Sequence, residues 1–367
     1  MIPAPHLATV AIRHGTESGA RPSRTRGTEN VTLPTENVTP STETGSSPVG
    51  TAHAPCHHGE LLQGVFLDAD GRRCAGLVTL PMAGPGSRAD FVRRPGTPPH
   101  ALTVVPADRT KAARAAVLTI EECARRTGLP AGGGELRLTG DVPVGLGMGS
   151  SSSDVIATVG AVADAYGLRL APATVARLAV RAELASDPLM LDGPPVLFAQ
   201  RQGRVIEVLG AALPPLVVVG CALGGGAPVD TLALPVREAS DADVEEFERL
   251  RALLRRAMTT GDVALLGEVA TASARRGQQV LGHPEFDALT AVARRAGAAG
   301  VQIAHSGTVA GVLFDPATPD LRHRVRGCRH ALNAHGIPTT RTFTTTPTTQ
   351  GDPEWTSTSP RRSAGRT

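Results

Sequence analysis

The sequence predicts an α+β fold in two halves, flanked by two tails without regular structure. Short apolar segments typical of strands alternate with amphipathic segments typical of helices, but without a strict β-α-β repeat. The pattern restarts after the Leu-Pro-Pro at residues 213–215. The 367 residues, 41% of them hydrophobic, suffice to form two moderate cores. We therefore expect one domain over residues 52–212 and a second over 213–343.

Apolar periodicity and turn residues give the expected order of elements in each half. In the first half we expect strands at 60–67, 74–80, 135–139, 196–199 and 205–209, and helices at 108–127, 155–166 and 173–185. In the second half we expect strands at 216–222, 301–304, 309–314 and 339–343, and helices between 241 and 296 and at 319–334. Residues 1–51 and 344–367 are rich in threonine and proline and lack apolar periodicity, so we expect disordered tails there.

The basic residues argue against two classes of binding protein. Lys111 is the only lysine, and no glycine loop precedes it, which excludes a P-loop NTPase. The formal net charge is only +3 and aromatic residues make up 2% of the chain, so little is available for stacking on bases. We therefore expect the arginine-rich segments to be solvated helix faces and expect no nucleic-acid partner.

The cysteines and the longest apolar runs indicate a reducing, non-membrane environment. The five cysteines are scattered and form no C-x-x-C pair, so neither a disulfide framework nor a zinc site is expected. His57 and His58 are expected to be ordinary loop or strand residues, because no partner pair lies at ligand spacing. No apolar run approaches 18 residues and no secretory signal is evident. We expect a cytoplasmic protein, either a monomer or a homodimer.

One segment is typical of phosphate binding. Residues 143–153 read P-V-G-L-G-M-G-S-S-S-S and lead directly into the helix expected from residue 155. Glycines let the backbone approach a phosphate closely, and the unpaired N–H groups of a helix N-terminus favour an anion. A flexible linker, or N-capping by one serine, would be the ordinary alternative. The abrupt change to an apolar helical period favours a phosphate-binding loop.

This segment resembles the second motif of the GHMP kinases, a superfamily that includes galactokinase, homoserine kinase and mevalonate kinase. That motif is usually written P-x-G-x-G-L-G-S-S-A-A. Here Met148 stands for the leucine, and Ser152 and Ser153 stand for the two alanines. The match covers nearly every fixed position.

Two further segments resemble motifs of one branch of that superfamily, the L-threonine kinases of cobalamin synthesis. Residues 54–66, A-P-C-H-H-G-E-L-L-Q-G-V-F, resemble P-x-x-C-G-E-L-x-Q-G. His58 stands where the branch usually has cysteine, and the lysine that other GHMP kinases carry in this motif is absent. Residues 297–315 contain A-H-S-G-T-V, the branch's form of the third motif.

The resemblance implies a two-domain fold, with an N-terminal α/β half containing a left-handed β-α-β crossover and a C-terminal ferredoxin-like half. It also implies that the protein uses ATP and Mg²⁺. The residues implied in ATP binding are Pro143, Gly145, Gly147, Gly149, Ser150, Ser151 and Ser152. With no lysine nearby, backbone donors and Mg²⁺ must supply most of the charge stabilisation.

The same resemblance implies roles for side chains outside the loop. Ser151 and Glu183 would bind Mg²⁺, and Asp187 would act as the base for the acceptor hydroxyl or orient it. The branch has E-P-T-D where this chain has E-L-A-S-D, one residue longer, at residues 183–187. A solvated helix end for Glu183 and a loop cap for Asp187 are the ordinary alternatives. The residues implied in acceptor contact are Glu60, Gln63, His305 and Ser306.

The function implied is ATP-dependent phosphorylation of a small-molecule hydroxyl, with L-threonine giving O-phospho-L-threonine and ADP. A second possibility within the class is another small alcohol, such as homoserine or a secondary-metabolite precursor. A possibility outside the class is an ATP-binding protein without kinase activity. Lys111 is expected at the surface, away from the nucleotide, and His305 is expected to support its loop or contact phosphate.

Overall fold

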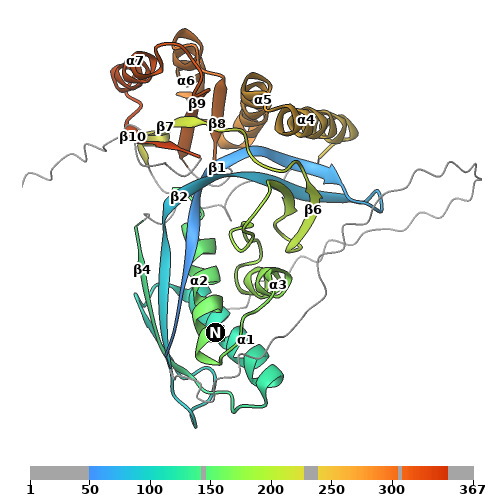
Figure 1. The fold of residues 1–367 in the computed structure, drawn as a ribbon, viewed down its shortest axis with the longest axis vertical. Coiled ribbons are helices and arrows are strands. Elements are labelled where there is room, and N and C mark those ends of the chain that lie inside the picture. The colour runs from blue at the N-terminus through green and yellow to red at the C-terminus, as the bar shows by residue number, and fades with distance from the viewer. Residues whose placement is uncertain (1–48, 142–145, 227–238, 305–307, 346–367) are drawn as a thin grey trace, which may run out of the picture. The chain divides into compact units, whose positions relative to one another are not determined.

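The computed structural model describes residues 49–141, 146–226, 239–304 and 308–345. Within these ranges ten strands form one sheet, with helices packed against it (Figure 1). The strands are β1 (Val49–Leu67), β2 (Arg73–Arg93), β3 (Leu102–Val105), β4 (Gly134–Gly140), β5 (Val196–Ala199), β6 (Arg204–Val208), β7 (Val217–Ala222), β8 (Gly300–Ile303), β9 (Val309–Phe314) and β10 (Thr339–Thr344). The helices are α1 (Thr110–Thr127), α2 (Ser150–Ala165), α3 (Pro172–Glu183), α4 (Asp241–Thr260), α5 (Val263–Leu281), α6 (Phe286–Arg295) and α7 (Leu321–Ala334), with a short 3-10 turn, η1 (Gly224–Gly226).

The long hairpin of β1 and β2 joins the two halves. Its antiparallel register runs from Val49 opposite Val92 to Leu67 opposite Arg73, and it is interrupted by shifts between residues 55 and 62. Within this irregular stretch, Glu60 forms a single pair with Ile303 of β8, which continues the sheet into the C-terminal half. The irregular stretch of β1 therefore lies where the two halves meet.

Both predicted tail boundaries need correction. Strand β1 begins at Val49, inside the predicted tail 1–51, and its first three residues pair with Asp90–Val92. A β-carbon at Gly50 would lie 2.2 Å from the Ala161 carbonyl oxygen of α2, so the strand passes directly against that helix. At the other end, Thr344 still pairs with β7 as part of β10. These pairings are with distant segments, and local apolar periodicity does not report them.

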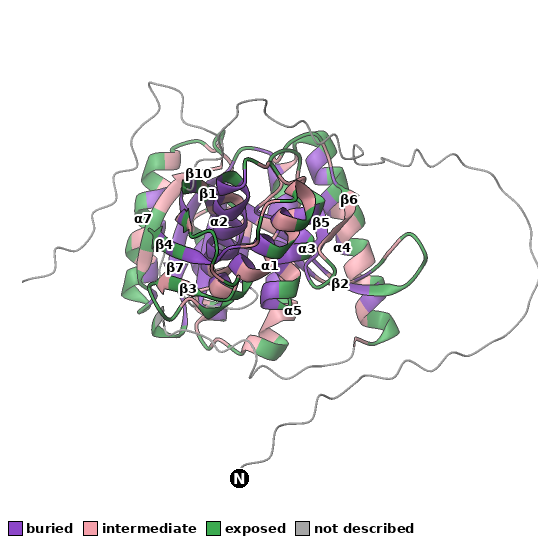
Figure 2. Cartoon of the chain, turned by 90° about the horizontal axis from the view of Figure 1, so that it is seen from below, coloured by how far each residue is buried: buried purple, intermediate pink, exposed green. Residues whose placement is uncertain are grey.

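The N-terminal half surrounds helix α2. Strands β3 and β4 are parallel and connected through α1, which supplies a β-α-β unit. The sequence analysis missed β3, which is only four residues long. Helix α2 contacts α1, α3, β1 and β2, and nearly all its residues are buried (Figure 2). A helix with apolar residues on every side needs such an enclosed position, and the buried polar residues of α2 lie mainly in its first turns.

The C-terminal half has the strand order β10-β7-β9-β8, with each neighbouring pair antiparallel. Numbered within this half, the order is fourth, first, third, second, the ferredoxin-like arrangement of a β-α-β-β-α-β chain. Helices α6 and α7 pack over a core of β7, β8 and β9. The predicted α+β fold with a ferredoxin-like second half is confirmed.

The domain boundary at residues 212/213 stays a prediction. A second core combines Leu61 and Leu80 of the long hairpin with Leu254 of α4 and Leu313 of β9, so apolar packing is continuous across that position. Among the described residues, no helix is both long and apolar enough to span a bilayer.

Candidate active site

The start of α2 is built for an anion. Gly147 and Gly149 have φ values of +82° and +69°, a region that favours glycine. The Ser153 N–H makes the first intrahelical bond, to the Gly149 carbonyl at 2.8 Å, so the preceding N–H groups have no acceptor within the helix. Together with the helix dipole, these donors favour negative charge. Pro143 and Gly145, which were also predicted to bind ATP, lie outside the described residues.

All three sequence motifs meet at this loop. The His57 N–H donates to the Met148 carbonyl at 3.2 Å, and the Val309 N–H donates to the Leu146 carbonyl at 3.1 Å. A β-carbon at Gly149 would lie 2.4 Å from the His57 ring. Residue 149 must therefore be glycine both for its backbone angle and because a side chain from the first motif fills the adjacent space.

Glu183, the last residue of α3, points at the first turn of α2. Its carboxylate accepts hydrogen bonds from the hydroxyls of Ser151 and Ser152, each at 2.9 Å. Burial, followed by the nearby charge of Asp187, raises the pKa of Glu183 to about 7. The ammonium of Lys111 lies 4.0 Å from the same carboxylate, although the Lys111 side chain is half exposed. Lys111 is thus at the surface, as predicted, but beside the candidate site.

Asp187 reaches the same place despite the extra residue in its loop. Its N–H donates to the Ser152 hydroxyl at 3.1 Å, so Ser152 contacts both predicted carboxylate residues. Between them, Leu184 ends α3 in the left-handed conformation, with φ +70°, and turns outward into solvent. The longer E-L-A-S-D segment therefore places its added length in an exposed turn and keeps the two acids together.

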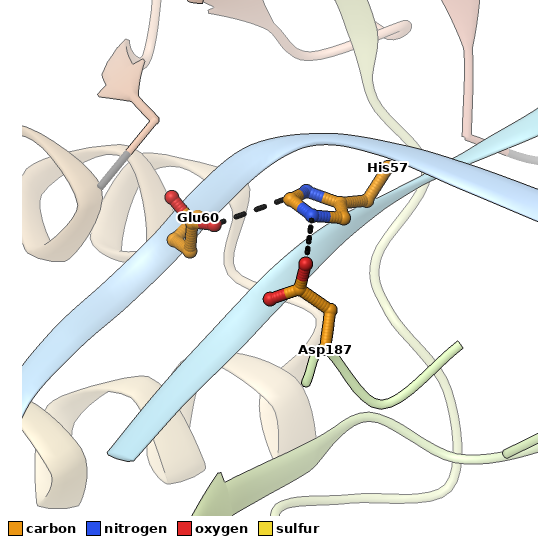
Figure 3. A group of neighbouring side chains, drawn as sticks. All are labelled: His57, Glu60 and Asp187. Carbon is orange, nitrogen blue, oxygen red and sulfur yellow. Dashed lines mark hydrogen bonds and ion pairs between the residues drawn. The ribbon is translucent and has the colours of Figure 1, made fainter. Parts of the chain in front are cut away.

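His57 lies between two carboxylates (Figure 3). Its Nε2 is 3.0 Å from Oδ2 of Asp187, and its Nδ1 is 3.2 Å from the Gly59 carbonyl and 3.9 Å from Oε1 of Glu60. Because both ring nitrogens face acceptors, the ring is placed to donate twice, which requires the imidazolium. Burial lowers the pKa of His57, but the charge and hydrogen bond of Asp187 outweigh it and raise the pKa to about 9. The sequence analysis missed this contact.

Two groups of ligand atoms could attract a cation here. His57, Glu60 and Asp187 bring ligand atoms within 4.8 Å of one another. However, the two carboxylates face different nitrogens of the imidazole, so a double hydrogen-bond donor fits this group better than a single ion. Ser151 and Glu183 instead offer hard oxygen atoms at the helix start, and the buried acid needs positive charge nearby. This pair fits Mg²⁺.

Comparison with known proteins matches both halves. The family model "GHMP kinases N terminal domain" matches residues 112–199, and "GHMP kinases C terminal" matches residues 250–326. The chain belongs to the GHMP kinases. An L-threonine kinase from Salmonella typhimurium is 28% identical over 191 residues, which cover 51% of this chain and 61% of that enzyme. This GHMP kinase thus spans less than two thirds of the length of the curated relative it matches.

Solved structures agree on the fold of this GHMP kinase. A homoserine kinase from Cytophaga hutchinsonii gives a TM-score of 0.59 at 17% identity, covering 83% of this chain and 96% of that one. A phosphomevalonate kinase from Streptococcus pneumoniae gives 0.56 at 13% identity, covering 81% and 98%. These structures support the two-domain GHMP fold implied by the motifs.

The other predicted site residues of this GHMP kinase divide into three groups. Ser150 opens α2 at the loop, whereas Ser153 is structural, donating to the Ala54 carbonyl and accepting from the Ser87 N–H. Glu60 and Gln63 lie on β1 and are buried. His305 and Ser306 lie outside the described residues. The roles assigned to all of these residues stay predictions.

Proposed function

We propose that this GHMP kinase transfers the γ-phosphoryl group of ATP to the hydroxyl of L-threonine, giving O-phospho-L-threonine and ADP. The observation that carries the proposal is the convergence of Glu183 and Asp187 on the N-terminus of α2. Phosphoryl transfer needs a phosphate-binding surface, charge stabilisation and a group that positions the attacking hydroxyl. The 28% sequence identity to an L-threonine kinase supports L-threonine as the acceptor.

Each part of the site has a role in this proposal. Gly147, Gly149 and the first N–H groups of α2 bind the phosphates of ATP. Ser151 and Glu183 would hold Mg²⁺, which when bound offsets the phosphate charge. Asp187 accepts the proton of the acceptor hydroxyl as transfer proceeds, or orients that hydroxyl.

His57 has a positioning role in the proposed reaction. A hydrogen bond at 3.0 Å fixes one carboxylate oxygen of Asp187 and so orients this carboxylate for the acceptor. Its positive charge also offsets part of the negative charge that Glu60, Glu183 and Asp187 bring together. This chain lacks the lysine that other GHMP kinases carry in the first motif, so a histidine of the same motif supplies a cation.

The test is product formation by the full chain with a panel of acceptors. ADP release and phosphorylated product, identified by mass spectrometry, would be measured with Mg·ATP and either L-threonine, L-homoserine, L-serine or mevalonate. The expected result is O-phospho-L-threonine with the highest kcat/KM in the panel. A higher kcat/KM for homoserine would move the assignment to the second acceptor. ATP binding without ADP release with any acceptor would contradict the kinase proposal.

A further inference from the structure

Five of the buried side-chain atoms that have no hydrogen-bond partner among the described residues belong to side chains around Gly224 and Gly277. Together the side chains that carry them are called the polar cluster: Gln63 on β1, Gln278 on α5, His283 and Glu285 between α5 and α6, and Thr308 before β9. A buried polar group left without a partner costs about 1–3 kcal/mol. Several such atoms gathered together indicate a site where a polar ligand supplies the missing bonds.

Gly224 lies next to three of the five side chains of the polar cluster, those of His283, Glu285 and Thr308. The Gly224 N–H donates to Oε1 of Glu285 at 3.1 Å, which leaves Oε2 as the unpartnered atom. A β-carbon at Gly224 would lie 3.6 Å from the methyl of Thr308 and 3.7 Å from Nδ1 of His283. The His283 N–H donates to Oε1 of Gln278 at 2.9 Å, which leaves that amide's NH₂ group as a donor.

The cluster extends toward the predicted catalytic groups. A β-carbon at Gly277, the residue before Gln278, would lie 3.4 Å from Nε2 of Gln63. Gln63 follows Glu60 by three residues on β1, a span of at most about 10 Å. From Glu60 the contacts continue through the His57 ring to Asp187, so the cluster lies on the same strand as the first motif of the candidate site.

The chain also connects the cluster to the phosphate-binding loop. Thr308 belongs to the A-H-S-G-T-V segment of the third motif, and its side chain is buried. The next residue, Val309, donates its N–H to the Leu146 carbonyl. One end of the cluster is thus one residue away from a direct contact with the loop.

The unpartnered atoms have the chemistry of an amino-acid site. Glu285 and Gln63 offer acceptor oxygens, which suit an ammonium group, and Gln278 offers a donor, which suits a carboxylate. The Thr308 hydroxyl and the unpartnered Nε2 of His283 can add a hydrogen bond to either the ammonium or the carboxylate group. Resting on the proposed kinase function, we propose that the polar cluster binds the ammonium and carboxylate groups of a small hydroxy amino acid.

This assignment separates amino-acid acceptors from hydroxy acids. A hydroxy acid without an ammonium group would leave the buried Glu285 oxygen unpaired and would place a second negative charge near it. Sites built to hydrogen-bond a substrate group discriminate strongly against analogues that lack the group. The cluster therefore favours L-threonine or L-homoserine over mevalonate.

Two conservative variants address the two ends of the amino acid separately. Glu285→Gln retains an oxygen for the Gly224 N–H and replaces the free acceptor with a donor. Gln278→Glu retains an oxygen for the His283 N–H and replaces the free donor with an acceptor. Glu268→Gln, an exposed residue of α5, is the matched control.

The experiment is isothermal titration of the full chain with L-threonine, with L-threoninol, which lacks the carboxylate, and with 3-hydroxybutyrate, which lacks the ammonium. Glu285→Gln should weaken binding of L-threonine and L-threoninol at least tenfold and should not weaken binding of 3-hydroxybutyrate, because it removes a negative charge that repels this anion. Gln278→Glu should weaken L-threonine and 3-hydroxybutyrate at least tenfold and leave L-threoninol unchanged. The Glu268→Gln control should match wild type with all three ligands.

The outcomes separate this inference from the proposed function. L-threonine binding that is equal in wild type and both variants, or absent in wild type, overturns the assignment of the cluster. If ADP release with L-threonine also persists in that case, the kinase proposal still stands. Selective weakening by the variants without ADP release in wild type supports the cluster and rejects the kinase proposal.

Discussion

His57 and His58 are consecutive residues of β1, and both are almost completely buried, yet the structure places them in opposite chemical settings. His57 contacts Asp187 and the loop before α2 in the N-terminal half. His58 contacts the C-terminal half, where its Nδ1 is 2.8 Å from Nε2 of Gln302 and its ring lies 5.1 Å from that of Phe343. The two histidines are equally buried, so the difference between them comes from the residues that each ring contacts.

The pKa values of the two rings move in opposite directions. Burial, reinforced by the positive charges of His57 and Arg341, lowers the pKa of His58 to about 3. Burial also disfavours charge on His57, but Asp187 outweighs it. We interpret His57 as a charged residue of the site and His58 as a neutral packing residue.

The largest expected effect is on the His57 side, where Asp187→Asn should lower kcat about 10²–10⁴-fold with little change in ATP affinity. Asparagine keeps the shape of the side chain and removes the charge that receives the hydroxyl proton. The measurement is kcat and KM for ATP and L-threonine. Asp192→Asn, an exposed acid in the same loop, is the control. Near-wild-type turnover in Asp187→Asn would remove Asp187 from the proposed mechanism.

For His58, the packing residue, the expected effect is on stability. His58→Ala should lower the free energy of unfolding by about 2–4 kcal/mol, because it leaves a cavity against β7 and β9. A β-carbon at Gly220 would lie 2.7 Å from the His58 ring, so these strands are shaped around it. Denaturant titration measures the loss, and kcat of the folded fraction should change less than threefold. A large fall in kcat with unchanged stability would reverse the roles assigned to the two histidines.

His57→Asn should reduce kcat about 10–100-fold, less than Asp187→Asn, because it removes a positioning contact and retains the carboxylate. A double-mutant cycle with Asp187→Asn tests the reason: the second change should add little once the first is made. Additive losses would show that His57 acts independently of Asp187.

The sequence predicts the parts of this site that depend on local pattern. The glycine loop leads into α2, and α3 ends at Glu183 close to its predicted end, because helical periodicity and helix-terminating residues are encoded within a few positions. The two-domain fold follows from the three segments that resemble GHMP kinase motifs, which occur in the same order as in that family. Local pattern is thus sufficient for the start of α2 and the end of α3, whereas the roles of Glu183 and Asp187 are implied by the resemblance and stay predictions.

The parts that the sequence analysis missed depend on contacts between distant segments. His57 and Asp187 are separated by 130 positions, and no local spacing links them. The absence of a lysine from the first motif was a usable signal, since a site with several acids needs another cation. Lys111 was assigned to the surface alone because its approach to Glu183 depends on how α1 packs beside α3.

The smallest expected effect is a difference in acid sensitivity. His58 has a folded-state pKa of about 3 against 6.5 when unfolded, so the unfolded state binds the extra proton and stability falls as pH drops below 6.5. The loss between pH 6.5 and about pH 5.5 should be about 1 kcal/mol. His57, with its raised pKa, loses its contribution as pH rises toward 9 and gains slightly as pH falls through 6.5, so it opposes the fall in the acid window and does not cause it. Denaturant titrations of His58→Gln should therefore show a smaller fall than wild type across this window, while His323→Gln, at an exposed histidine, should match wild type. Equal falls in wild type and His58→Gln would show that the His58 ring takes up a proton in the folded protein, and the contrast with His57 would fail.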